Sequence, residues 1–342
     1  MTGYSVVAIP GDGIGPEVMA AVREIVTAAD APLTFVEKLA GEAAFESSGE
    51  LLPEATVDAI REHSVALKGP CTTPIGEGFR SINVQLRQTL ELYAAVRPVR
   101  TMPGVQTRYD DVDLVIVREN TEGLYSGVEN AIARDVVVSM KVASRSACER
   151  ISRWAFRYAT RRKRRRVTVF HKANIMKMTD GMFLDEARKI HRHEYPNIEH
   201  DEMIIDAALM RLVQDPSEFD IMLCENLYGD LVSDLCAGMV GGLGVTPGAN
   251  FGDECAVFEA VHGSAPDIAG KGVANPLALL MSATMMLNHL AEKHDDARCQ
   301  DAATRIRSAY DASLEAGETT RDLGGTLDTS GFARAIMARL SG

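Results

Sequence analysis

Short apolar runs typical of strands alternate along this chain with longer stretches that carry apolar residues at helical spacing. The strand-like runs are 5–10, 65–68, 113–117, 167–172, 203–206, 221–225 and 256–261. The helical stretches are 17–30, 180–193, 231–240, 277–290 and 302–316. This alternation predicts an α/β protein. No repeat, low-complexity linker or change in composition marks a domain boundary.

Composition limits the classes of function. The 342 residues are 46% hydrophobic and 25% charged, which is enough for a sizeable core in one large or two ordinary domains. A formal net charge of -12 argues against a general binder of nucleic acid or anionic membranes. The block of six cations at 161–166 is an exception. We interpret it as a solvated complement to a helix C-terminus, with a polyanion or regulatory contact as the alternative.

The cysteines and the N-terminal residues suggest a cytoplasmic protein. Six cysteines are scattered without a C-x-x-C pair, so neither a zinc site nor a disulfide framework is expected. The first residues, Met1-Thr2-Gly3-Tyr4, lead into an apolar run without a basic leader, and no apolar run approaches bilayer length. We therefore expect no membrane segment.

Two aspartates, Asp230 and Asp234, lie four residues apart in a stretch with helical character. In a helix they project from one face about one turn apart and can hold a divalent cation. A lone pair of this kind is usually a solvated helix face. The surrounding residues, E-N-L-Y-G before the pair and G-G-L-G-V-T-P-G-A-N after it, make coincidence a poor explanation.

Four further segments occur with this one: G-D-G-I-G-P-E at 11–17, R-S-I-N-V-Q-L-R at 80–87, R-E-N-T-E-G-L-Y at 118–125 and H-G-S-A-P-D at 262–267. Together the five segments resemble the β-decarboxylating dehydrogenases, which comprise isocitrate, homoisocitrate, 3-isopropylmalate and tartrate dehydrogenases. The resemblance runs from Val6 to about Leu290 in the family's order.

The resemblance implies two domains that share a mixed, largely parallel sheet flanked by helices, with the active site in the cleft between them. Residues 1–94 and 242–342 would form the larger, cofactor-binding domain. Residues 95–241 would form a smaller dimerisation domain, with an interlocking arm near 123–144. A homodimer with shared active sites is therefore expected. This is not a standard Rossmann fold, and Gly11, Gly13 and Gly15 are interpreted as a tight turn because their spacing departs from G-x-G-x-x-G.

The resemblance also implies a metal site. Asp230 and Asp234 of one protomer and Asp206 of the other would bind Mg²⁺ or Mn²⁺, for which carboxylate oxygens are suitable ligands. Such an ion stabilises the enolate that forms when a 2-hydroxy acid is oxidised and decarboxylated. From the sequence alone, Asp206 could equally cap a helix that begins at Ala207.

The substrate and proton-transfer residues follow from the same resemblance. Arg87, Arg97 and Arg118 match the arginines that bind substrate carboxylates bidentately. Lys172, from the second protomer, would assist removal of the hydroxyl proton, and Tyr125 would protonate the enol carbon. Asn174 lies in the segment that matches around Lys172 and is a further predicted substrate contact.

The cofactor is expected to be NAD, bound between two segments. The predicted contacts are Pro70, Cys71 and Thr73 near the nicotinamide, with Thr72 beside them, and His262, Gly263, Ser264, Ala265, Pro266, Asp267, Ile268 and Asn275 around the adenosine. The Asp267-Ile268 pair is decisive, because a carboxylate accepts hydrogen bonds from both ribose hydroxyls and repels a 2′-phosphate. NADP-dependent relatives carry Lys and Tyr at these positions.

Ser81 and Asn83 determine which substrate we expect. Isocitrate enzymes carry a serine and an asparagine two residues apart at this place, where isopropylmalate enzymes carry apolar residues. The predicted reaction is therefore metal-dependent oxidative decarboxylation of isocitrate to 2-oxoglutarate and CO₂ with reduction of NAD, a step of the tricarboxylic acid cycle. Homoisocitrate dehydrogenase is the nearest alternative, followed by 3-isopropylmalate or tartrate dehydrogenase. A non-catalytic regulatory subunit is a remote alternative, since such subunits lose metal or proton-transfer residues.

Overall fold

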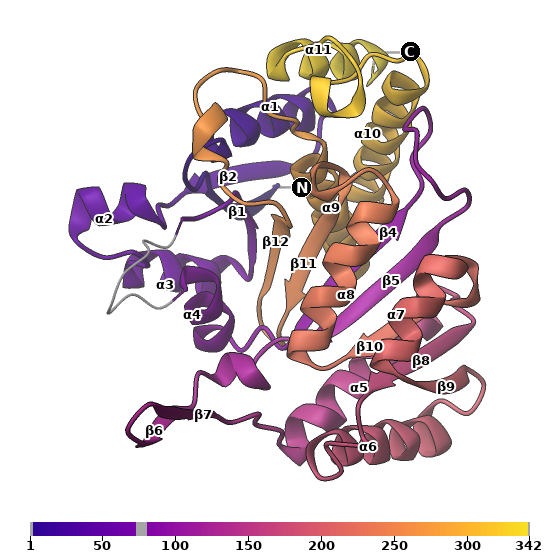
Figure 1. Ribbon diagram of the computed structural model, residues 1–342. Helices are drawn as coiled ribbons and strands as arrows, with labels where there is room; N and C mark the ends of the chain where they lie inside the picture. The colour runs from indigo at the N-terminus through magenta and orange to yellow at the C-terminus, as the bar shows by residue number, and fades with distance from the viewer. Residues whose placement is uncertain (1–2, 73–80, 341–342) are drawn as a thin grey trace. The chain divides into compact units, whose positions relative to one another are not determined.

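The computed structural model describes residues 3–72 and 81–340, and these form two compact units (Figure 1). The first unit comprises Met1–Leu90, Thr101–Asp110 and Ala237–Gly342, and the second comprises Glu91–Arg100 and Asp111–Cys236. The expected functional division at 95 and 241 stays a prediction, and the compact units depart from it where Thr101–Asp110 joins the first unit.

The sheet of the first unit has the strand order β2-β1-β3-β12-β11. All neighbouring strands run parallel except β11 and β12, which are antiparallel. Residues Val6–Ile9 of β1 are fully buried, as expected for a strand covered on both faces. The strands are β1 (Tyr4–Ile9), β2 (Leu33–Glu37), β3 (Val65–Lys68), β11 (Pro247–Phe251) and β12 (Ala256–Ala260).

Helices cover this sheet. α9 is apolar around most of its circumference and packs on β3, β11, β12 and α10, so its burial follows from its composition. α3 packs on β1 and β3. The helices are α1 (Gly15–Ala28), α2 (Glu42–Ser48), α3 (Glu54–His63), α4 (Ile82–Thr89), α9 (Leu277–His294), α10 (Ala297–Glu315) and α11 (Thr329–Leu340), with 3₁₀ turns η3 (Leu243–Val245), η4 (Pro266–Ile268) and η5 (Arg321–Leu323).

The sheet of the second unit has the order β4-β5-β10-β8-β9, in which only β4 and β5 are antiparallel. The expected strand at 203–206 is wrong in its bounds, because β9 ends before Asp206. The first four residues of β9, E-H-D-E, are polar, which suits an edge strand. They give no apolar run by which the strand could be recognised in the sequence. The strands are β4 (Ala94–Arg100), β5 (Asp113–Glu119), β8 (Arg166–His171), β9 (Glu199–Ile204) and β10 (Ile221–Cys224).

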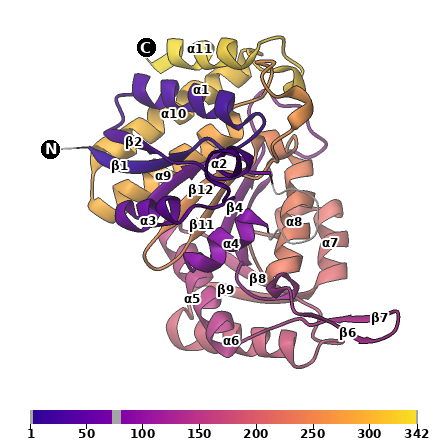
Figure 2. The ribbon, with the colours of Figure 1, turned by 90° about the vertical axis from the view of Figure 1, so that its left-hand side faces the viewer.

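The second unit also contains four helices and two short strands outside this sheet. β6 and β7 form a separate two-stranded ribbon that extends away from the rest of the unit (Figures 1 and 2). α8 begins directly after β10, five residues before the expected start at Leu231. The elements are α5 (Arg145–Arg161), α6 (Thr179–Glu194), α7 (Ile205–Gln214), α8 (Asn226–Met239), β6 (Glu129–Ala133), β7 (Val136–Ser139), η1 (Leu124–Ser126) and η2 (Pro216–Glu218).

The cationic block at 161–166 ends α5 and begins β8. Lys163 has a left-handed backbone, and the Arg164 amide donates to the Ala159 carbonyl, which closes the helix end. The Arg164 guanidinium forms ion pairs with Asp113 at 2.6 Å and with Asp220 at 3.0 Å. Arg164 therefore has a structural role, since it joins the helix end to the beginnings of β5 and β10. Within 3–72 and 81–340, no helix combines the length and apolarity that a bilayer crossing requires.

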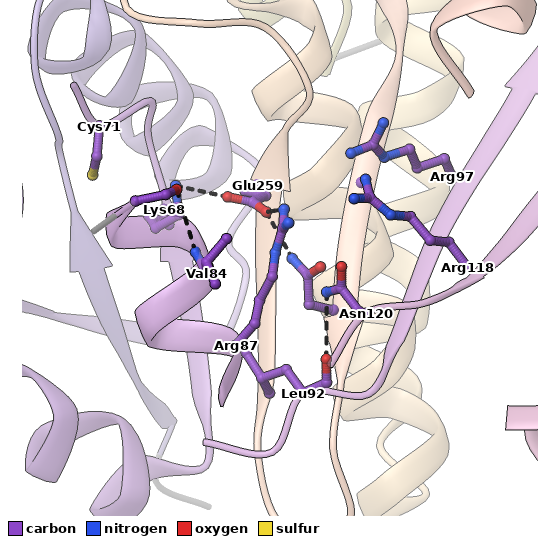
Figure 3. Close-up of polar contacts among 12 residues, drawn as sticks. Lys68, Cys71, Val84, Arg87, Leu92, Arg97, Arg118, Asn120 and Glu259 are labelled. Carbon is purple, nitrogen blue, oxygen red and sulfur yellow. Dashed lines mark hydrogen bonds and ion pairs between the residues drawn. The ribbon is translucent and has the colours of Figure 1, made fainter. Parts of the chain in front are cut away.

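A buried ion pair lies in the sheet of the first unit (Figure 3). The Lys68 ammonium lies 2.6 Å from the Glu259 carboxylate, which also accepts hydrogen bonds from Asn250 at 2.7 Å and from Arg87 at 3.1 Å. Burial alone would raise the pKa of Glu259, but Lys68 and Arg87 outweigh it and hold that pKa well below its ordinary value. Burial likewise disfavours the charge on Lys68, and Glu259 outweighs it and raises the pKa.

We predict that Glu259→Gln destabilises the protein by about 3–5 kcal/mol, because it leaves the buried Lys68 charge uncompensated. Glu37→Gln, which removes only the exposed pair with Arg23, should cost less than about 1 kcal/mol. The pKa of Glu259 is lowered, so its contribution is complete above the unfolded value of about 4.3 and disappears as the pH falls through the folded value. Urea titrations from neutral to acidic pH measure both effects, and equal losses for the two variants would contradict the account.

Candidate active site

Arg118 is the most buried guanidinium in the second unit, with 1% of the residue exposed. It follows the apolar residues of β5, and its stem crosses the first turn of α8. Its Nε and Nη2 donate to Asn226 Oδ1 at 3.0 and 2.6 Å, and Nη1 contacts the Asp230 carboxylate. The prediction that an arginine at the end of this strand enters a polar site is consistent with these contacts.

Arg97 lies on the neighbouring strand β4 and projects from the same face. Ala95 pairs with Arg118 and Arg97 pairs with Ile116, so the two arginines are diagonal neighbours, as Figure 3 shows. The Arg97 guanidinium hydrogen-bonds to Ser233, lies 3.5 Å from Asp234 and lies 3.8 Å from Asp230. The second unit thus brings two predicted substrate arginines to two predicted metal ligands.

Tyr125 lies in η1, after the loop that leaves β5. Its hydroxyl donates to Asp230, and the Arg118 guanidinium lies 5.1 Å from its ring centre. Burial, followed by the Asp230 carboxylate, raises the pKa of the Tyr125 hydroxyl. The phenol therefore holds its proton at neutral pH, which is what a proton donor requires.

Lys172 and Asp206 pair with each other through their side chains. Lys172 follows β8, and its backbone amide donates to Asp180 at 2.7 Å. Asp206 lies within the first turn of α7, which begins at Ile205, so the alternative that it caps a helix starting at Ala207 is wrong. The hydrogen bond from Lys172 lowers the pKa of Asp206. Asn174 is exposed in the turn after Lys172.

The carboxylates fit a hard divalent cation in their chemistry, since all the donors are oxygen atoms. Asp234 is 60% exposed at its side chain, and Asp230 is 31% exposed. In 3–72 and 81–340, no three His, Cys, Asp or Glu side chains gather as a metal site within one chain. Among these described residues, Asp206 therefore does not gather with Asp230 and Asp234 within one chain, and its supply by a second chain stays a prediction.

In the first unit, the turn between β1 and α1 joins the two predicted cofactor segments. Gly11 and Gly13 have φ of +76° and +59°, and a Cβ at either position would lie 2.0 Å from the Pro70 or Ser264 carbonyl oxygen. Only glycine permits this approach. The Asp12 carboxylate accepts from the Thr72 amide at 2.7 Å, and the Thr72 hydroxyl donates to Ser264 at 2.7 Å. The sequence reading missed Asp12, whose carboxylate holds this arrangement.

His262 presents an unused acceptor beside these segments. Its Nδ1 lies 3.0 Å from the Gly263 carbonyl, so Nδ1 carries the proton, and Nε2 is buried without a hydrogen-bond partner among the described residues. Burial lowers the pKa of His262 and keeps the ring neutral. Such an acceptor fits a base with an amino group. Asp267 is exposed in η4, with its carboxylate open to hydroxyl donors.

Other predicted cofactor residues have structural partners. Asn275 donates to Asp322 at 2.9 Å and accepts from the Leu277 amide at 2.9 Å, so it ties the loop to η5 and α9. Pro70 and Cys71 lie after β3 with Thr72, and Gly263, Ala265, Pro266 and Ile268 continue the loop around Ser264 and Asp267. Burial raises the pKa of the Cys71 thiol. Thr73 and Arg80 lie outside the described residues.

α4 carries the predicted substrate selectivity residues. Ser81 is its N-cap and accepts from the Val84 amide at 3.5 Å, a role the sequence reading missed, and its hydroxyl proton stays available for donation. Asn83 Oδ1 and Arg87 Nε are buried without hydrogen-bond partners among the described residues. Arg87 is anchored through Nη2 to Glu259. Unsatisfied buried polar atoms are costly, so their presence favours a ligand at this helix.

Comparisons with known proteins identify the family of this chain. A family model described as isocitrate/isopropylmalate dehydrogenase matches residues 5–336. NAD isocitrate dehydrogenase catalytic subunit 5 of Arabidopsis thaliana is 47% identical and covers 97% of this chain and 87% of that protein. Chloroplastic 3-isopropylmalate dehydrogenase of Solanum tuberosum is 50% identical over 86% of this chain and 82% of that protein.

A solved structure shows the same fold. The crystal structure of isocitrate dehydrogenase from Methylococcus capsulatus superposes with a TM-score of 0.93 at 47% identity, covering 99% of this chain and 100% of that chain. The expected fold class is confirmed by this likeness and by the family match. The chain belongs to the isocitrate/isopropylmalate dehydrogenase family.

Proposed function

We propose that this protein catalyses the NAD-dependent oxidative decarboxylation of isocitrate to 2-oxoglutarate and CO₂. The observation that carries the proposal is the cluster of Arg97 and Arg118 with Asp230 and Asp234 in the second unit. Two permanently charged forks suit substrate carboxylates, and two carboxylates on one helix face suit a divalent cation. The chain also matches NAD isocitrate dehydrogenases over nearly its whole length, which supports the same conclusion.

The residues have separable functions in this reaction. Arg97 and Arg118 bind and orient substrate carboxylates, Lys172 assists removal of the hydroxyl proton, and Tyr125 donates a proton to the enol carbon. The aspartates would hold Mg²⁺ or Mn²⁺, which would supply Lewis-acid stabilisation of negative charge, and bound NAD would supply the hydride acceptor. Asp267 favours NAD, because an exposed carboxylate there accepts from ribose hydroxyls and repels a 2′-phosphate.

The choice of isocitrate depends on α4. Ser81 can donate its hydroxyl proton, and the Asn83 amide, whose Oδ1 has no hydrogen-bond partner among the described residues, can turn to present its NH₂ group, so both suit a third carboxylate. Arg87 and Asn174 stay predicted substrate contacts, and Thr72 and Cys71 stay predicted neighbours of the nicotinamide. 3-Isopropylmalate is the second candidate, because the Solanum tuberosum relative named for it is 50% identical. Homoisocitrate stays an alternative that also carries three carboxylates.

The proposed assembly is a homodimer with shared active sites. Apolar residues are exposed on the β6–β7 ribbon, including Ile132 at 63% and Val137 at 66%, and a second chain would cover them. Several relatives are named as subunits, which keeps a mixed assembly as the competing arrangement. The cytoplasmic location stays part of the proposal, although several relatives are named as mitochondrial proteins.

We predict that kcat/KM with NAD and Mg²⁺ is highest for isocitrate and falls by about a thousandfold for 3-isopropylmalate, which leaves polar groups unpaired. NADP should be poorer than NAD by about two orders of magnitude. Steady-state kinetics with isocitrate, homoisocitrate, 3-isopropylmalate and tartrate measure these ratios. A preference for another acid would overturn the substrate, and the absence of turnover with all four would favour the regulatory-subunit alternative.

We further predict that inactive Asp206→Asn and Asp230→Asn chains regain activity when mixed. If each site takes Asp230 from one chain and Asp206 from the other, one of the two sites in a mixed dimer contains only unmodified aspartates. Asp201→Asn, in the same unit and outside the predicted site, serves as the matched control. No recovery in mixtures shown by mass spectrometry to exchange chains would indicate sites built within single chains.

A further inference from the structure

We propose that Asn226 and Gly229, at the start of α8, are positioning residues that fix the Arg118 guanidinium for a substrate carboxylate. The inference rests on the proposed function of Arg118 and adds the two residues that hold it. Both lie in the second unit with Arg118, and neither was among the predicted site residues.

The Asn226 amide fixes the rotation of the guanidinium plane. Asn226 is 2% exposed, and its Oδ1 accepts from both Nε and Nη2 of Arg118. Its Nδ2 donates to the Glu122 carbonyl oxygen at 2.8 Å. Because that partner accepts only, the amide cannot turn over, and its oxygen must face the arginine. The Nε–Nη2 edge is therefore occupied, and Nη1 is directed toward Asp230.

Gly229 sets the path of the Arg118 stem. A Cβ at Gly229 would lie 2.5 Å from Cγ, 2.6 Å from Cβ and 3.1 Å from Cδ of Arg118. The stem thus lies directly against the backbone of α8. Glycine in a helix interior destabilises the helix by about 1 kcal/mol relative to alanine, so Gly229 is unfavourable for helix formation. The close approach of Arg118 accounts for it.

The same amide joins Arg118 to the loop that carries Tyr125. The Glu119 carboxylate accepts from the amides of Thr121 at 3.0 Å and Glu122 at 2.9 Å, which folds the loop back toward β5. The Glu122 carbonyl is then in place for Asn226. Asn226 therefore fixes the arginine relative to the loop from which the proposed proton donor projects.

Gly238 provides a matched control for Gly229. It lies in the same helix, is exposed, and a Cβ added there would meet nothing within 4 Å. Alanine has a higher helix propensity than glycine at both positions. Only the variant at Gly229 moves the arginine, so a difference between the two variants reports on Arg118 and not on the helix.

The test measures the binary Kd values of isocitrate with Mg²⁺ and of NAD by calorimetry, together with KM, kcat and Tm, for the intact assembly. We expect Gly229→Ala and Asn226→Ala to raise the Kd and KM for isocitrate by at least about tenfold, with kcat and the Kd for NAD changed by less than about threefold. Gly238→Ala should leave all of these unchanged. Asn226→Ala carries the test if Gly229→Ala does not fold.

The Arg118→Gln variant distinguishes a failure of the positioning role from a failure of the proposed function. Suppose that Arg118→Gln weakens isocitrate binding by more than about tenfold, while Gly229→Ala and Asn226→Ala bind isocitrate like the parent. The positioning role is then overturned, and the proposed function stands. If Arg118→Gln itself binds isocitrate normally, the proposed role of the arginine is wrong, and the inference is overturned with it. If Gly229→Ala weakens the binding of isocitrate and of NAD equally and also lowers the Tm, Gly229 has a structural role only.

Discussion

The buried guanidinium of Arg118 is the constraint on which the second unit's site depends. A charge that is 99% shielded within the fold costs several kcal/mol unless its hydrogen bonds are satisfied, and Asn226 and Asp230 satisfy them. The start of α8 must therefore lie against the end of β5. That placement puts Asp230 and Asp234 on the helix face that meets Arg97, so one buried charge organises the whole group.

The first unit also contains buried charges that need partners. Lys68 and Glu259 pair inside the sheet, and the pair extends to Arg87, which is a predicted substrate contact. In each unit, therefore, a buried acidic or amide group holds an arginine that is a predicted substrate contact. Positive charge held in advance costs no reorganisation when a carboxylate binds, and this is the main way a protein site gains from electrostatics.

The sequence predicted the α/β class and several of the long helices, because these are properties of local periodicity, while the roles of the motif residues stay predictions. It misplaced β9, whose polar residues at a sheet edge hide its period. It also missed Asp12, Asn226 and Glu259, since each acts on a residue distant along the chain: Asn226 and Arg118 are 108 positions apart. Nothing in a single sequence reports such a pairing. Gly229 gave no signal either, because the expected helical stretch began at Leu231, after this glycine.

The proposed reaction requires that Asp230 and Asp234 hold the cation beside the arginines that bind the substrate. Crystals grown with Mn²⁺ and isocitrate, measured at the manganese absorption edge, test it directly. We expect an anomalous peak bonded to Asp230 and Asp234 of one chain and to Asp206 of a second chain, with an isocitrate carboxylate on Arg118. A peak held by other residues, or isocitrate bound away from Arg118, would contradict it.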